Sequence, residues 1–242
     1  MISLTSAEIN AWIVAFFFPL TRILALIVAA PPFNNVGLTV RARLILGLAI
    51  AIAITPGLPK IPSIEPASGL GLLVLAQQII IGFAMGFAVR LVFSSIDLAG
   101  SMISTQMGLG FATAYDPQSA SQTPVISEFI GVLALLVFMA INGHLMVIAT
   151  LVQSFSVLPI GAGVLSNAVW LNIANAGGII FSSGVLLALP VVVALLITNI
   201  ALGVLGRVAP QLNLMAIGFP VTIVLGFVAL LVSLSHLTAP LQ

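Results

Sequence analysis

The chain has 242 residues, of which 61% are hydrophobic and only 5% are charged, with a formal net charge of +1 and no cysteine. A soluble domain has about 25% charged residues, so this composition cannot supply a water-exposed surface. The scattered cations exclude a nucleic-acid site, and the absence of cysteine excludes disulfide frameworks and thiolate metal sites. The composition indicates an all-α, polytopic membrane-type protein.

Apolar runs predict about six long, partly kinked helices in a single domain, residues 1–242. Their approximate bounds are Ala7–Ala30, Leu44–Thr55, Gly69–Val89, Val125–Ser154, Gly177–Leu205 and Leu214–Leu237. A spanning helix needs roughly 20 residues, so the second run is short unless it begins near Thr39. The connections between the runs leave no room for a separate soluble domain.

Three prolines lie inside apolar runs, Pro19, Pro190 and Pro220. Proline removes an intrahelical hydrogen bond and clashes with the preceding turn, so these helices should kink. Broken backbone at membrane depth needs neighbouring protein or a polar cavity, which points to partners or a conduit. An ordinary kink in a membrane helix is the equally weighted alternative.

The third run combines close-packing glycines with two charges. Gly82 and Gly86 form a GxxxG pattern, which lets two helix backbones approach closely. Arg90 and Asp97 are seven residues apart and share a face if the helix continues past Val89. Charges beside an apolar span must face protein or water, so they predict a subunit interface or pore wall, or else an interfacial anchor.

Residues 101–122 mix flexible glycine with bulky apolar side chains. The candidate residues here are Met107, Gly108, Leu109, Gly110, Phe111 and Tyr115. A solvated loop has little need of such apolar groups, whereas a hydrophobic constriction can block water and ions by dewetting. The alternative is a surface loop that rests on the bilayer or on a neighbour.

No constellation of residues predicts catalysis, a cofactor or a metal. His144 and His236 are isolated, without a second ligand at helical spacing. Neither a nucleophile elbow nor a phosphate-binding glycine loop is present, and no carboxylate pair has a spacing typical of acid–base chemistry. We therefore expect a protein that is not an enzyme.

Several short motifs follow one another in a specific order. They include Pro31 to Phe33, Gly82 to Arg90, Asp97 to Gly100, Gln106 to Gly108, Thr123 to Ser127, Asn142 to His144, Leu158 to Gly161 and Arg207 to Asn213. Together they resemble the FliR family of flagellar biosynthesis proteins over essentially the whole chain. This ordered set is far more specific than any single glycine pair.

The resemblance implies a subunit of the flagellar type III export gate, in the basal body at the bacterial inner membrane. The implied partners are FliP and FliQ homologues, with FlhB and FlhA homologues, membrane lipid and unfolded flagellar export substrates. It also implies that the hydrophobic helices can be raised inside the assembly instead of crossing the bilayer, which hydropathy cannot distinguish.

The resemblance also assigns roles to individual residues. The loop from Gly108 to Tyr115 corresponds to a pore plug, with Leu109 and Phe111 as occluding residues and Gly108 and Gly110 as mobile points. Deleting this loop is expected to make the gate leak ions. The resemblance also implies a role for Arg207, Pro210 and Asn213. They are expected to lie near the cytoplasmic entrance or at a contact with a partner subunit.

Two other functions are compatible with the pattern. The first is the equivalent subunit of a virulence-type injection apparatus, which shares this architecture. The second is a small-solute transporter with broken helices around a midplane site, which predicts an internal repeat, and none is evident. A membrane enzyme ranks last because it needs a convergent polar cluster.

Overall fold

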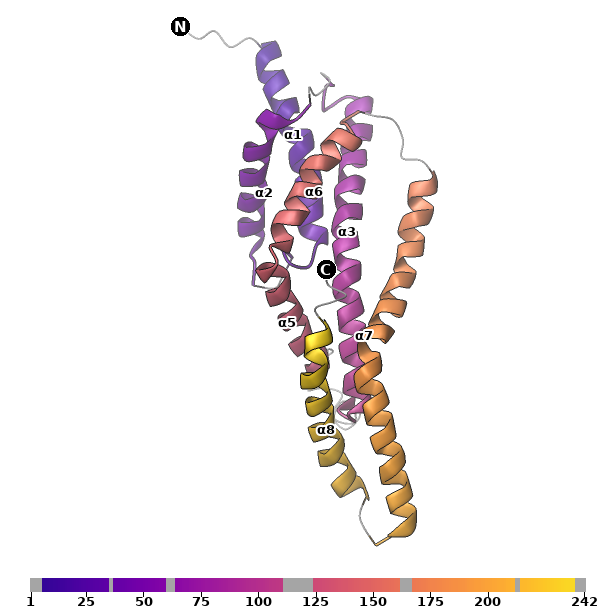
Figure 1. Cartoon of the computed structure of the whole chain (residues 1–242). Helices are drawn as coiled ribbons and strands as arrows, with labels where there is room; N and C mark the ends of the chain where they lie inside the picture. The colour runs from indigo at the N-terminus through magenta and orange to yellow at the C-terminus, as the bar shows by residue number, and fades with distance from the viewer. Residues whose placement is uncertain are drawn as a thin grey trace. The chain divides into compact units, whose positions relative to one another are not determined.

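The computed structural model describes residues 6–34, 37–59, 64–110, 124–161, 167–211 and 214–237, which are helices and their connections (Figure 1). The helices are α1 Ser6–Ala29, α2 Val40–Ile54, α3 Gly69–Gln106, α5 Val125–Ala140, α6 Gly143–Val157, α7 Asn167–Val208 and α8 Leu214–Leu237. A 3-10 turn, η1 Thr55–Gly57, extends α2. The all-α prediction is confirmed.

The predicted run Val125–Ser154 consists of two helices, α5 and α6. The break falls at Asn142, which has a left-handed backbone with φ 58° and donates its N–H to the carbonyl of Met139 at 3.1 Å. Asparagine tolerates this conformation better than other non-glycine residues. One apolar run therefore becomes two helices because of a single backbone conformation.

The second helix begins at Val40, next to Thr39, which is the start that a membrane-spanning length requires. The hydroxyl oxygen of Thr39 accepts a hydrogen bond from the N–H of Ala42 at 3.3 Å, which caps the first turn of α2. Within the described residues, three helical stretches are long and apolar enough to cross a membrane, namely Val40–Gly57, Gly69–Gln106 and Leu171–Val208. A fourth is present if the broken pair α5 and α6 counts as one span.

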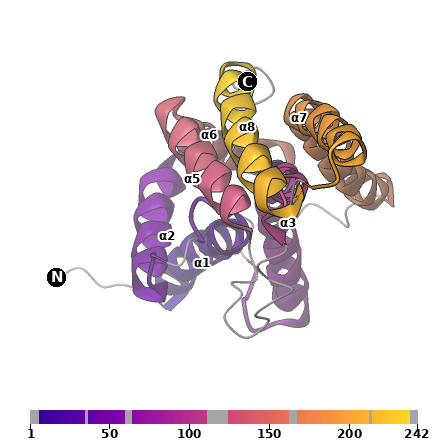
Figure 2. The same ribbon diagram turned by 90° about the horizontal axis from the view of Figure 1, so that it is seen from below.

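The first compact unit comprises Met1–Leu91 and Met139–Ala176. Its core forms around α1, whose Phe18, Ile23 and Leu26 are buried together with Leu151 and Phe155 of α6. Helices α1 and α2 lie side by side in both ribbon views (Figure 2). The first part of α3 packs on α1 through the glycines described below.

The second compact unit comprises Val92–Phe138 and Gly177–Gln242, and so contains the last part of α3. Its core consists of Ile96, Ala99, Ile103, Met107, Ile126, Ile130, Ala134, Ala188, Val191, Leu195 and Leu230. Gly184 of α7 allows close approach to α3, because a methyl group there would lie 2.8 Å from the Leu98 side chain. The end of α3 is thus surrounded by α5, α7 and α8.

Candidate functional site

Gly82 and Gly86 lie where α3 crosses α1. A methyl group on Gly82 would overlap the carbonyl oxygen of Arg22 and lie 2.9 Å from the Cβ of Ala25. A methyl group on Gly86 would lie 2.5 Å from the Cβ of Ala29. Only hydrogen atoms fit between these backbones, so the two glycines form a close helix–helix seam inside the chain itself.

Arg22 is completely buried beside this seam. Its Nε donates to Oε1 of Gln78 at 2.8 Å, Nη1 to the hydroxyl of Ser154 at 3.1 Å, and Nη2 to the carbonyl of Leu158 at 2.9 Å. Its guanidinium carbon also lies 4.2 Å from the ring centroid of Phe155. One side chain therefore connects α1, α3 and α6.

Neutral groups compensate the charge of Arg22. Ser154 and Phe155 lie in the last turn of α6 and Leu158 follows directly, so the cation occupies the negative end of the α6 dipole. The Nε2 atom of Gln78 is buried without a hydrogen-bond partner. Arg22 is absent from the predicted site residues, although an arginine in an apolar helix is itself a signal of buried pairing or function.

Arg90 and Asp97 both lie on α3 with exposed side chains. The structure describes no ion pair for either of them. The backbone carbonyl of Asp97 accepts a hydrogen bond from the hydroxyl of Ser127 at 2.9 Å, which ties α3 to α5. The two predicted charges therefore lie on the surface of this chain, where other protein, lipid or water can contact them.

The start of the predicted plug forms the end of α3. Gly108 has φ +81°, and the N–H of Gly108 donates to Thr105 while that of Leu109 donates to Ser104. This is a Schellman motif, in which glycine takes the left-handed position after the last helical turn. Leu109 is half-buried and Gly110 is exposed, whereas Phe111 and Tyr115 lie outside the described residues.

Met107 is fixed by α8. Its side chain is completely buried, and its carbonyl lies 3.2 Å from the hydroxyl of Thr222, whose proton it shares with the Phe219 carbonyl at 3.0 Å. Gly226 makes room for it, since a methyl group there would lie 2.6 Å from the Cγ of Met107. Met107 is thus an anchor at the start of the loop in this structure.

The bond from Thr222 predicts a measurable contribution to stability. Thr222→Val should lower the free energy of unfolding in detergent by up to about 1 kcal/mol, because the Met107 carbonyl loses the donor that it shares with the Phe219 carbonyl. Thr198→Val is the matched control, since among the described residues the Thr198 hydroxyl donates to the Ala194 carbonyl of its own helix and to no other group. Denaturant titration of both variants would contradict the anchor if they shifted equally.

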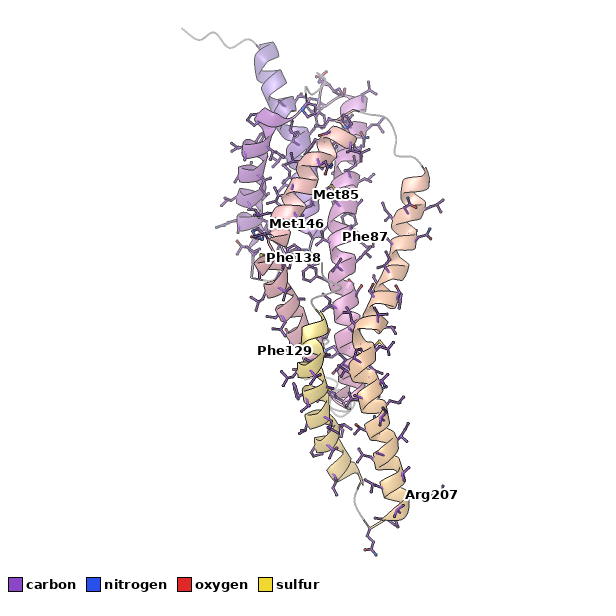
Figure 3. All side chains as sticks on the ribbon, viewed as in Figure 1. Met85, Phe87, Phe129, Phe138, Met146 and Arg207 are labelled. Atoms are coloured by element: carbon purple, nitrogen blue, oxygen red, sulfur yellow. The ribbon has the colours of Figure 1, made fainter. Side chains whose placement is uncertain are left out.

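Arg207 lies in the last turn of α7 with an exposed side chain (Figure 3). A cation there complements the negative end of the helix dipole. Pro210 follows the end of the helix and is also exposed, and Asn213 lies outside the described residues. Within the described part of the chain, neither Arg207 nor Pro210 makes a hydrogen bond or ion pair with the plug or glycine positions.

The fold and these sites define a helical membrane protein whose buried polar groups serve packing. A family model for bacterial export proteins, family 1, matches residues 13–242. The flagellar biosynthetic protein FliR of Escherichia coli K12 is 42% identical over 240 residues, which cover 99% of this chain and 91% of that protein.

Other relatives give the same result. FliR of Pectobacterium carotovorum is 41% identical over 95% of this chain and 88% of its own length, and FliR of Bacillus subtilis is 28% identical over 91% and 86%. The chain belongs to the FliR family of flagellar biosynthetic proteins, which are non-enzymatic components of an export apparatus. The resemblance found in the sequence is confirmed.

Proposed function

We propose that the chain is a structural subunit of the flagellar type III export gate. In this proposal residues 1–242 form one export-gate domain, part of the channel wall and its plug, through which unfolded flagellar proteins pass. FliP and FliQ homologues complete the gate, FlhB and FlhA homologues lie next to it, and the assembly belongs to the basal body at the inner membrane. Its similarity to flagellar relatives favours this gate over an injection apparatus.

The length of the exposed apolar face of α7 carries the proposal. Ile179 is 54% exposed and Val208 is 77% exposed, and large exposed apolar side chains recur between them along the part of α7 that lies in the second unit. At 1.5 Å per residue this stretch is about 45 Å long. The hydrocarbon core of a bilayer is only about 30 Å thick.

Tilting does not remove the mismatch. At the average tilt of about 20° the stretch rises roughly 42 Å along the membrane normal, and at 40°, the upper end of the observed range, it still rises roughly 34 Å. The surplus apolar surface therefore has to be covered by other protein, because water cannot cover it without a large hydrophobic penalty. A subunit held among other helices meets this requirement, and an isolated transporter does not.

The anchored start of the loop supports the plug role. Met107 and Gly108 are fixed by α8 and by the end of α3, so a plug needs only the residues beyond them to move. The exposed Gly110 follows after Leu109 and precedes Phe111. In the proposal Leu109, Phe111 and Tyr115 close the passage by excluding water.

Removing residues 110–115 while keeping Met107 to Leu109 should make the assembled gate leak ions. The anchor on α8 remains, so co-purification with FliP and FliQ homologues should be unchanged. Ion conductance of gates in planar bilayers or whole cells is the measurement. A tight gate in this variant, with normal assembly, would rule out the plug role.

A second variant tests whether closure depends on the apolar side chains of the loop or only on its length. Replacing Leu109, Phe111 and Tyr115 with serine keeps the loop and should still produce the leak, because polar groups keep a constriction wet. Leu109→Met combined with Phe111→Leu is the matched control and should stay closed. Equal conductance in the serine and apolar variants would contradict closure by dewetting.

A further inference from the structure

The exposed face of α3 changes its chemistry along the helix. Up to Val92 its exposed large side chains are apolar apart from Arg90, and the apolar ones are Leu70, Leu72, Leu73, Ile79, Ile80, Phe83 and Val92. In the described stretch 93–110 no large hydrophobic side chain is exposed. The helix is continuous through this change.

Polar residues replace the apolar ones at helical spacing. Ser94, Asp97, Ser101 and Thr105 follow one another at intervals of three and four residues, which places them on one face. Asp97 and Thr105 are exposed, and Ser94 and Ser101 are half-buried. We call these four residues the α3 polar stripe.

The opposite side of the same turns belongs to the core of the second unit. Ile96, Ala99 and Ile103 are buried there. The stripe is therefore the outer face of an amphipathic segment. Three or four residues beyond Thr105 the chain reaches Gly108 and Leu109, so the stripe leads directly to the anchored start of the loop.

The length of the apolar part of α3, and the contrast between the polar stripe and the apolar face of α7, indicate that lipid does not have to cover the stripe. The apolar part before Arg90, Gly69–Val89, is by itself long enough to cross about 30 Å of hydrocarbon. In the second unit, α7 keeps large exposed apolar side chains from Ile179 to Val208. An exposed carboxylate among hydroxyls is costly in hydrocarbon and inexpensive in water.

We propose that the α3 polar stripe is a water-facing wall along which an unfolded polypeptide passes. This inference rests on the proposed function and adds the surface that the exported chain meets. An unfolded chain has unpaired N–H and C=O groups that need hydrogen-bond partners. The hydroxyls of Ser101 and Thr105 donate to carbonyls of α3 itself, so their oxygens and the Asp97 carboxylate can accept from N–H groups, while water at a hydrated wall can donate to C=O groups. Such a wall also offers little apolar surface on which exported hydrophobic side chains could stick.

The absence of cysteine from the chain makes the test direct. Single variants Ser94→Cys, Ser101→Cys and Thr105→Cys are assembled with cysteine-free partner subunits in membrane vesicles. Each is reacted with a small, charged, membrane-impermeant methanethiosulfonate reagent, which attacks the thiolate that forms in water. Val193→Cys and Ile197→Cys are the controls, because both lie on the exposed apolar face of α7.

Labelling at the stripe should be at least about tenfold faster than at the two α7 positions, since a thiol ionises in water and not among apolar groups. An export substrate halted in passage should slow labelling at the stripe and leave the α7 rates unchanged. Co-purification with FliP and FliQ homologues confirms that each variant assembles.

Three results would overturn the inference. Equal slow rates at the stripe and on α7 would place the stripe in lipid or packed protein. Labelling of the detergent-isolated chain but not of the assembled gate would make the stripe a subunit interface. Labelling that a halted substrate does not slow would make it wet but outside the passage. The proposed function has its own test, the deletion of residues 110–115. A gate that stays tight after this deletion would contradict the proposed function, whatever the labelling rates are.

Discussion

Arg22→Met should lower the free energy of unfolding by about 3 kcal/mol in detergent. The substitution keeps a long side chain but leaves the Gln78 and Leu158 carbonyls and the Ser154 hydroxyl without their donor. Each buried acceptor that loses its partner contributes about 1 kcal/mol or more. Because these acceptors lie on α3, in the last turn of α6 and directly after it, the loss should also reduce the amount of assembled gate.

Graded variants make the prediction specific. Arg22→Lys should recover only part of the stability, since an ammonium group cannot donate in the three directions of the guanidinium. Ser154→Ala removes one acceptor and should cost about 1 kcal/mol. Arg41→Met is the control, because Arg41 is exposed in the first turn of α2. Denaturant titrations in which Arg22→Met matches Arg41→Met would show that the buried network contributes nothing.

Gly82→Ala should also destabilise the chain, by about 1–3 kcal/mol. The new methyl group would overlap the backbone carbonyl of Arg22, and a backbone atom cannot move aside as a flexible side chain can. Helices α1 and α3 would have to separate, which also weakens the hydrogen bond from Arg22 to Gln78. The measurement is thermal unfolding in detergent together with the yield of assembled gate.

Gly178→Ala provides a control of opposite sign. Gly178 lies inside α7 with no neighbouring atom within 4 Å of the added methyl group. Alanine is a better helix former than glycine there, by about 1 kcal/mol, so this variant should be as stable as the parent or more stable. If Gly82→Ala behaved like Gly178→Ala, the close seam between α1 and α3 would be disproved.

The predicted plug shows what a local sequence pattern can predict and what it cannot. Glycine beside bulky apolar residues correctly marks a change in the chain after Gln106, and Gly108 does interrupt the helix. The sequence pattern places Met107 in the predicted plug, because Met107 is apolar and lies beside glycine as Leu109 does. Its burial depends on Thr222 and Gly226, more than a hundred residues later in the chain, which no local pattern contains.

The sequence by itself determined the class of protein and the positions of most helices. An apolar, nearly uncharged chain can satisfy its backbone only within helices that lipid or protein covers, so composition and run length were sufficient. Ordered motifs of the same sequence identified the FliR family.

Only the tertiary structure decided which faces are buried and which polar groups meet. These helices are apolar on nearly every side, so hydrophobic periodicity does not distinguish a core face from an outer one. Arg22 finds Gln78, Ser154 and Leu158 at separations of 56, 132 and 136 residues. Such contacts depend on which helices become neighbours, and that choice is made by packing between distant segments.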